Sequence, residues 1–287
     1  MGQTPVRTAA DVTSMRGMTA GRHSCLVRLL LVAVLALGAL VAPSHLAASA
    51  KQRPRSAPPI FVALDEVDPT IVQDIRYRTQ HNFIGRRIHG YRQPLCILTR
   101  PTARALARAQ DALRPLGYSL KVYDCYRPQT AVDQFVRWAE RLHDDRMKAE
   151  FYPDVDKSQL FADGYIAAKS GHTRGSTVDL TIVELPVAPQ PRWRPSMGLV
   201  PCYAPYEQRF PDNSVDMGTG YDCMDTLSHT LDPRIRGEAR DNRLLLKSTL
   251  EAVGLVNYPL EWWHYTLADE PFPNRYFDFP VSRRALR

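Results

Sequence analysis

Three stretches of the chain repeat their apolar side chains with the period of an amphipathic helix. They predict helices over residues 102–116, 129–147 and 238–252. Thr102 is the expected N-cap of the first helix because it follows Pro101, and Gly117 is expected to end this helix. The expected apolar face of the third helix consists of Leu244, Leu245, Leu246 and Leu250.

Short runs of apolar and β-branched residues lie between these helices and predict strands. These runs cover residues 71–77, 120–124 and 178–183. Residues 260–267 are aromatic and also favour a strand. In a strand, Glu261 and His264 would face opposite sides, whereas in a helical turn they would share a face. The pattern leaves this choice open.

Two stretches lack such periodicity. Residues 51–63 begin with a polar, Pro-rich sequence and predict an extended linker. Residues 184–215 are also rich in Pro, and a loop of this length inside a domain is typical of a lid or an insertion. Residues 282–287 form a short basic tail after the domain, which we expect to span residues 64–281.

The N-terminal 50 residues have the anatomy of a secretory signal peptide. Arg16, Arg22 and Arg28 precede the apolar run 29–41, and Ala48-Ser49-Ala50 is a cleavage signal of small residues. The alternative is an uncleaved anchor, but a membrane span needs about 20 apolar residues and this run is shorter. We therefore expect cleavage near Ala50, export to the periplasm or medium, and no stable membrane association afterwards.

Composition narrows the class of protein further. Hydrophobic residues make up 44% and charged residues 23% of the 287 positions, which is typical of a globular chain. Residues 1–50 contain four Arg and one Asp, so 33 basic and 29 acidic residues remain after cleavage, a net charge of +4. This excess is small and dispersed, and no aromatic residues alternate with basic ones, so we expect no nucleic-acid partner.

Four cysteines remain outside the signal peptide: Cys96, Cys125, Cys202 and Cys223. An even number in an exported chain favours two disulfides. We expect Cys96–Cys125 and Cys202–Cys223, because each pair closes a modest loop. A zinc-thiolate site is the competing interpretation, but the chain has no C-x-x-C pair.

Two short motifs together offer the groups of a catalytic zinc site. Ser170 to Asp179 supplies His172 and Asp179, and Glu261-Trp262-Trp263-His264 supplies His264 and a further carboxylate. Catalytic zinc commonly takes three protein ligands and one water, and a nearby Glu removes a proton from that water. His172, Asp179 and His264 fit the ligand roles, and Glu261 fits the base. The chain contains no H-E-x-x-H, G-x-S-x-G or phosphate-binding glycine motif.

Arg127 follows the strand predicted at 120–124, and Pro128 favours an extended backbone at this arginine. An Arg at a strand end can offer a fork of donors to an oxyanion in a cleft. A surface Arg paired with a carboxylate is the alternative, and the residues alone favour it.

At these positions the chain resembles the D-alanyl-D-alanine dipeptidases of the VanX type, zinc peptidases related to D,D-carboxypeptidases and to the hedgehog-like metal fold. The likeness covers roughly residues 64–281. The motifs stand in the family's order at residues 77–85, 123–128, 170–179, 217–222, 261–265, 269–274 and 276–280. The resemblance implies one α+β domain, with a central, mostly antiparallel sheet flanked by helices and a zinc site in a cleft.

The resemblance also implies roles for individual residues. His172, Asp179 and His264 would bind one Zn²⁺, Glu261 would be the general base and acid, and Arg127 would stabilise the tetrahedral oxyanion. The residues expected to hold the substrate's termini are Tyr77, Ser170 and Asp222, with Asp222 near the ammonium and Asp124 orienting Arg127. The chain departs from the family at Cys125, where Gly is common, and in the length of the 184–215 loop.

We therefore expect zinc-dependent hydrolysis of the D-Ala-D-Ala dipeptide to two D-alanines, during turnover of peptidoglycan fragments. One alternative is a D,D- or L,D-carboxypeptidase that acts on longer wall peptides. Another is a zinc-containing module that binds the wall without catalysis, although such a module needs neither Glu261 nor Arg127.

Overall fold

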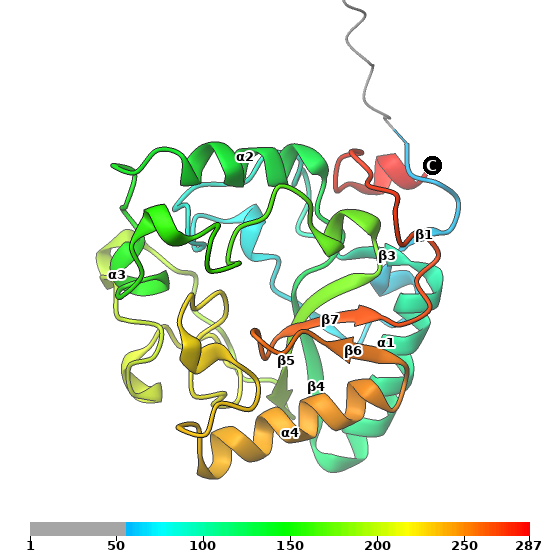
Figure 1. Cartoon of the computed structure of the whole chain (residues 1–287). Coiled ribbons are helices and arrows are strands. Elements are labelled where there is room, and N and C mark those ends of the chain that lie inside the picture. Colours follow the sequence, from blue (N-terminus) through cyan, green and yellow to red (C-terminus); the bar gives the residue numbers. More distant parts are fainter. Residues whose placement is uncertain (1–55) are drawn as a thin grey trace, which may run out of the picture. The chain divides into compact units, whose positions relative to one another are not determined.

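Five short strands form the central sheet of the protein, seen in a computed structural model that describes residues 56–287 (Figure 1). In sheet order they are β2 (Val72–Gln73), β4 (Tyr118–Asp124), β5 (Thr177–Glu184), β7 (His264–Leu267) and β6 (Leu255–Asn257). β2 is parallel to β4, and each other neighbouring pair is antiparallel. The fold is therefore mixed α+β with a mostly antiparallel sheet, as predicted.

The helices of the described chain are α1 (Arg100–Leu113), α2 (Gln129–Ala139), α3 (Lys148–Phe151) and α4 (Gly237–Glu251). α1 packs against β4 and α4, and α4 also contacts β6, so these two helices contact each other as well as the sheet (Figure 1). β4 and β5 are buried over nearly their whole length. Their apolar runs are therefore the centre of the core.

The pairing of β4, β5 and β7 aligns three polar residues across the sheet. Asp124 is the Cα partner of Asp179, and Asp179 is the partner of His264. An irregularity between Val122 and Asp124 shifts the register just before this row. Since neighbouring strands lie about 5 Å apart, this register alone brings three functional side chains close together.

Both ends of the described chain belong to the fold, so the predicted linker and tail are corrected. Phe61–Ala63, assigned to the linker, forms the buried strand β1, which pairs with β3 (Ile97–Thr99). The predicted tail forms a 3-10 turn over Arg283–Leu286, whose Ala285 carbonyl accepts a 2.7 Å hydrogen bond from Ala57 N. The apolar side chains in both segments explain this packing.

Several predicted boundaries were wrong. α1 begins before Thr102, which lies inside the helix and contacts Thr99 Oγ1 at 2.8 Å. The first turn accepts Pro101 because proline lacks a backbone N–H, and an N–H in the first turn would have no partner within the helix. The helix predicted at 129–147 ends at Ala139. The strand predicted at 71–77 is limited to Val72–Gln73, and a 3-10 turn follows at Arg76–Arg78.

Both expected disulfides are present. Cys96–Cys125 closes a separation of 29 residues, and Cys202–Cys223 closes one of 21 residues. The zinc-thiolate alternative is therefore wrong. Of the stretch 184–215, Glu184 is the last residue of β5, and residues 185–215 contain two 3-10 turns and no strand or α-helix.

No helix in residues 56–287 is both long and apolar enough to span a bilayer. The predicted signal peptide lies outside the described residues.

Candidate active site

Three potential metal ligands converge at the aligned strand ends. The ligand atoms of His172, Asp179 and His264 all lie within 4.8 Å of one another. His172 Nε2 and His264 Nδ1 are each 3.1 Å from Asp179 Oδ1, which is buried and makes no hydrogen bond within the described chain. A buried oxygen without a partner, between two imidazole nitrogens, suits a divalent cation.

The sequence around His172 explains how this side chain reaches the cluster. Ser170 begins a 3-10 turn over Gly171–Arg174, and its hydroxyl accepts a hydrogen bond from His172 N at 3.3 Å. Gly175 ends the turn with φ +86°, and a Cβ there would lie 2.1 Å from the Phe61 ring. Only glycine fits this position without displacing the ring. The chain then enters β5, which carries Asp179.

A backbone contact fixes the tautomer of His172. Its Nδ1 donates to the carbonyl of Cys125 at 2.8 Å, so Nε2 keeps its lone pair toward Asp179 and His264. Cys125 is held in turn by its disulfide to Cys96. The first disulfide therefore supports a candidate ligand.

The pKa values of Asp179 and His264 are shifted within the cluster. Burial by itself would raise the pKa of Asp179, but the neighbouring His172 and His264 hold it well below its usual range. Burial by itself would lower the pKa of His264, but the adjoining Asp179 and Glu261 raise it to about 9. Asp179 is thus ionised, and a cation would displace a proton from His264.

The open choice at residues 260–267 is now resolved. The backbone turns before β7, with Glu261 N donating to Tyr258 O at 3.0 Å and His264 N to Glu261 O at 3.3 Å. Glu261 and His264 therefore face the same site, and Glu261 Oε2 lies 3.3 Å from His264 Nδ1. The side chain of Glu261 is 20% exposed, which leaves it accessible to water.

Arg127 points into the site and is not a surface residue. Its Nε donates to Asp124 Oδ2 at 2.9 Å, and its Nη2 lies 3.6 Å from Asp179 Oδ2. The guanidinium also lies 4.9 Å from the centre of the Tyr77 ring. Asp124 itself accepts a 2.6 Å hydrogen bond from Tyr91, a partner that the sequence did not indicate. The contacts with Asp124 and Tyr77 thus orient the Arg127 guanidinium toward the cavity.

Asp222 forms the far end of the site. Its Oδ2 accepts a hydrogen bond from the Tyr77 hydroxyl at 2.9 Å. Burial raises the pKa of Asp222 well above its usual range, and the negative charge of Asp179 raises it further. A buried carboxyl in this state gains most from a cationic group placed beside it, and the contact would lower its pKa again.

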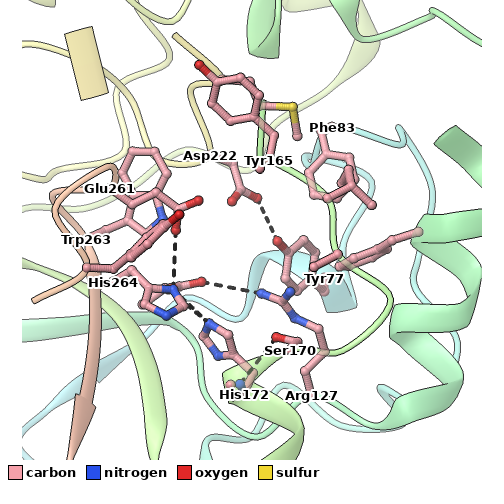
Figure 2. Close-up of a pocket in the computed structure, with 18 of the residues that line it drawn as sticks. Tyr77, Phe83, Arg127, Tyr165, Ser170, His172, Asp222, Glu261, Trp263 and His264 are labelled. Atoms are coloured by element: carbon pink, nitrogen blue, oxygen red, sulfur yellow. Dashed lines mark hydrogen bonds and ion pairs between the residues drawn. The ribbon is translucent and has the colours of Figure 1, made fainter. Parts of the chain in front are cut away.

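Figure 2 shows these groups around one cavity, with Glu261 and His264 on one wall and Tyr77 and Arg127 on the opposite wall. The cavity has a volume of about 320 Å³, and Ser170, His172, Asp179 and Asp222 also line it. Asp124 is fully buried behind Arg127. The structure thus brings together all the residues proposed from the sequence for metal, catalysis and substrate.

The aromatic wall of the cavity was missed. Its members are Phe83, Phe135, Tyr165, Tyr258 and Trp263, together with Met224. Phe135 lies in the stretch predicted as a helix over residues 129–147, and Tyr165 lies in residues 148–169, for which the sequence predicts no element. Phe83 and Trp263 lie inside the motifs at residues 77–85 and 261–265, so these are the two members that the motifs could have indicated.

Comparison with known proteins gives a consistent result. A family model described as D-ala-D-ala dipeptidase, of the peptidase M15 family, matches residues 59–187 and 211–282. A D-alanyl-D-alanine dipeptidase of Streptomyces coelicolor is 38% identical over 222 residues, which cover 77% of this chain and 98% of that protein. One from Enterococcus faecalis is 37% identical over the same shares, and one from Escherichia coli is 30% identical over 72% of this chain and 84% of its own.

The family model leaves residues 188–210 unmatched, in the middle of the long Pro-rich loop. The matched parts contain every residue discussed at the cavity. This chain therefore belongs to the D-Ala-D-Ala dipeptidase family of metallopeptidases, peptidase M15.

Proposed function

We propose that this protein is a zinc-dependent dipeptidase that hydrolyses D-Ala-D-Ala to two D-alanines. The main support is the cavity, in which the His172–Asp179–His264 cluster lies between Glu261 and Arg127. Its volume of about 320 Å³ is at the lower end for ligand sites, which favours a dipeptide over a longer chain.

The donor set supports zinc as the metal. Two imidazoles and one carboxylate are a common catalytic zinc set, and they leave a position for water or substrate. His172 Nε2, His264 and Asp179 Oδ1 would hold the ion. When bound, Zn²⁺ supplies a Lewis acid for the scissile carbonyl and lowers the pKa of water to about 7.

The chain's own residues then divide the work of hydrolysis. Glu261 accepts a proton from the attacking water and delivers it to the leaving amine. Arg127 donates to the oxygen that becomes negative in the tetrahedral state, and loss of such a donor typically costs about 10²–10³ in rate. Asp124 holds Arg127 through the 2.9 Å contact at Nε, so its fork needs no reorganisation during the reaction.

Substrate recognition follows from charge. Asp222 and the Tyr77 hydroxyl form a polar end that suits the dipeptide's ammonium, and Ser170 lies on the cavity wall for the other terminus. The cavity walls of Phe83, Phe135 and Tyr165 would exclude water and limit the length of the peptide.

The direct test is hydrolysis by the purified protein with Zn²⁺, measured as released D-alanine. The substrates are D-Ala-D-Ala, L-Ala-L-Ala and a pentapeptide that ends in D-Ala-D-Ala. We expect turnover of the free D,D-dipeptide alone, abolished by EDTA and restored by Zn²⁺. Cleavage of the pentapeptide would instead assign a carboxypeptidase, and bound zinc without any turnover would favour a non-catalytic wall-binding module.

We propose further that the protein is exported and acts on peptidoglycan fragments. The support is the signal-like sequence of residues 1–50 and two disulfides, which persist in oxidising compartments. Mass spectrometry of the protein from periplasm or medium should give an N-terminus at or near Lys51. An intact N-terminus on a cytosolic protein would reject this proposal.

A further inference from the structure

The two oxygens of the Asp179 carboxylate have different surroundings. Oδ1 is 3.1 Å from one nitrogen of each imidazole and makes no hydrogen bond within the described residues. Oδ2 accepts a hydrogen bond from the Tyr221 hydroxyl at 3.0 Å and lies 3.6 Å from Arg127 Nη2. One oxygen is thus held by the protein, and the other is left for a metal.

Tyr221 itself is firmly placed. It is buried, its ring stacks on Tyr123 with centroids 4.4 Å apart, and its edge meets Trp263 at 5.6 Å. The next residue, Asp222, has φ +59°, a left-handed backbone that is uncommon for a residue with a side chain. This turn lets the neighbouring side chains serve different tasks, because Asp222 contacts Tyr77 while Tyr221 contacts Asp179.

Tyr123, whose ring stacks on Tyr221, is itself held by a hydrogen bond. The Tyr123 hydroxyl donates to Asp212 Oδ2 at 2.6 Å, and Arg76 Nη2 lies 2.9 Å from the same oxygen. Asp212 follows closely on residues 188–210, which the family model does not match. A continuous series of contacts therefore leads from the end of this extra segment, through two stacked tyrosines, to the candidate metal ligand.

We propose that Tyr221 is a positioning residue for the metal site, which holds Asp179 Oδ2 so that Asp179 binds the metal through Oδ1 alone. This inference rests on the proposed function, because it assumes a metal at the His172–Asp179–His264 cluster. Outer hydrogen bonds of this kind typically contribute about 10–100-fold to metal affinity. Tyr221 touches neither the substrate nor the reacting atoms in this proposal.

The matched pair of variants is Tyr221→Phe and Tyr152→Phe. Both remove a single buried hydroxyl and keep the ring, but the Tyr152 hydroxyl has no hydrogen-bond partner in the described chain. Zinc dissociation constants are measured by competition with a chromogenic chelator, a readout that needs no catalysis. We expect binding weakened about 10–100-fold in Tyr221→Phe, and a value close to wild type in Tyr152→Phe.

A second readout distinguishes positioning from a general loss of structure. In the Co²⁺-loaded protein, release of Oδ2 lets Asp179 bind through both oxygens, which raises the coordination number and weakens the visible absorption bands. We expect this weakening in Tyr221→Phe, with the melting temperature of the metal-free protein close to that of Tyr152→Phe. A spectrum like that of wild type, or an equal zinc constant, would overturn the inference.

The outcomes also separate this inference from the proposed function. If wild-type protein binds no zinc, the proposed metal site fails, and the role of Tyr221 fails with it. If wild type binds zinc and hydrolyses D-Ala-D-Ala while Tyr221→Phe binds zinc equally well, only the role of Tyr221 is rejected. A Tyr123→Phe variant, which keeps the stacked ring and loses its anchor, should give a smaller loss of affinity.

Discussion

At the scale of single residues, Glu261 occupies a position between two chemical roles. Its carboxylate is 3.3 Å from His264 Nδ1, close enough to the metal cluster to be taken for a ligand. Exposure does not separate the roles, because the proposed ligand His264 is 19% exposed and Glu261 is 20% exposed. In the described chain, the group of possible ligand atoms that lie within 4.8 Å of one another consists of His172, Asp179 and His264 and leaves Glu261 out, which favours the base.

We expect Glu261→Gln to keep zinc and lose turnover, because the amide has a similar shape but cannot accept the proton. Loss of a general base typically costs about 10²–10⁴ in rate. The rate constant for D-Ala-D-Ala and the zinc stoichiometry are measured on the same preparation. Glu251→Gln, on the outer side of α4, is the control. Loss of zinc in Glu261→Gln would show that Glu261 is a ligand.

The residues of the site were largely predictable because chemistry restricts them. Few side chains bind zinc or move protons, so His172, Asp179 and His264 stand out within two short motifs. Tyr221 could not be recognised in this way, since a tyrosine in a sequence has no spacing that separates a buried donor from a core ring. Its role depends on Asp179 being 3.0 Å away, which only the folded chain shows.

At the scale of elements, the central strand β4 carries a buried cation. Lys121 is fully buried, and together with Arg76 it faces the carboxylates of Asp74 and Asp212. Burial would raise the pKa of Asp74, but Arg76 and Lys121 lower it to about 2. The pKa of Asp212 is lowered in the same way, mainly by Lys121 against the effect of burial. The positive charges of the two basic side chains are thus balanced by the two carboxylates.

Asp212→Asn should destabilise the protein by about 3–5 kcal/mol, because two buried cations would then face one carboxylate. Carboxylates with a lowered pKa stabilise the fold above their unfolded pKa of about 4, and this contribution is lost as pH falls. Wild-type stability should therefore decline between about pH 4 and pH 2. The free energy of unfolding in urea tests both statements.

The matched control is Asp241→Asn, an exposed carboxylate on α4. It should change the free energy of unfolding by less than about 0.5 kcal/mol. The decline in acid should also be smaller in Asp212→Asn than in wild type, since one titrating carboxylate is missing. An unaltered stability of Asp212→Asn at neutral pH would contradict the balance described here.

Elements with strong periodicity could be predicted from the sequence, but the residues that a helix buries could not always be predicted. The helix predicted at 238–252 is α4, yet Leu244 is 40% exposed while Arg243 is 1% exposed. The buried guanidinium donates to the carbonyls of Met217, Leu227 and His229, which satisfies its charge and donors. An apolar stripe cannot indicate such a residue, because the carbonyls that accept its donors come from a distant loop.

At the scale of the whole molecule, the site depends on which strands become neighbours. Asp124, Asp179 and His264 are far apart in the sequence and meet because β5 lies between β4 and β7. Periodicity predicted the strands, but it contains no information on their order. The resemblance to a family gave the grouping of the residues, and the sheet register explains it physically.

The Cys202–Cys223 disulfide also determines whether the two pieces of a chain cut by a protease stay covalently joined. A cut between these cysteines, for example at the exposed Glu207 or Gln208, would leave both pieces covalently joined. A cut after the exposed Arg192 lies outside both disulfide loops and would give two pieces with no bond between them. Cys223 directly follows Asp222, so the disulfide joins the chain at Cys202 to a point beside the substrate cavity. After a cut between Cys202 and Cys223, the two pieces would stay in one molecule until a reductant breaks this disulfide.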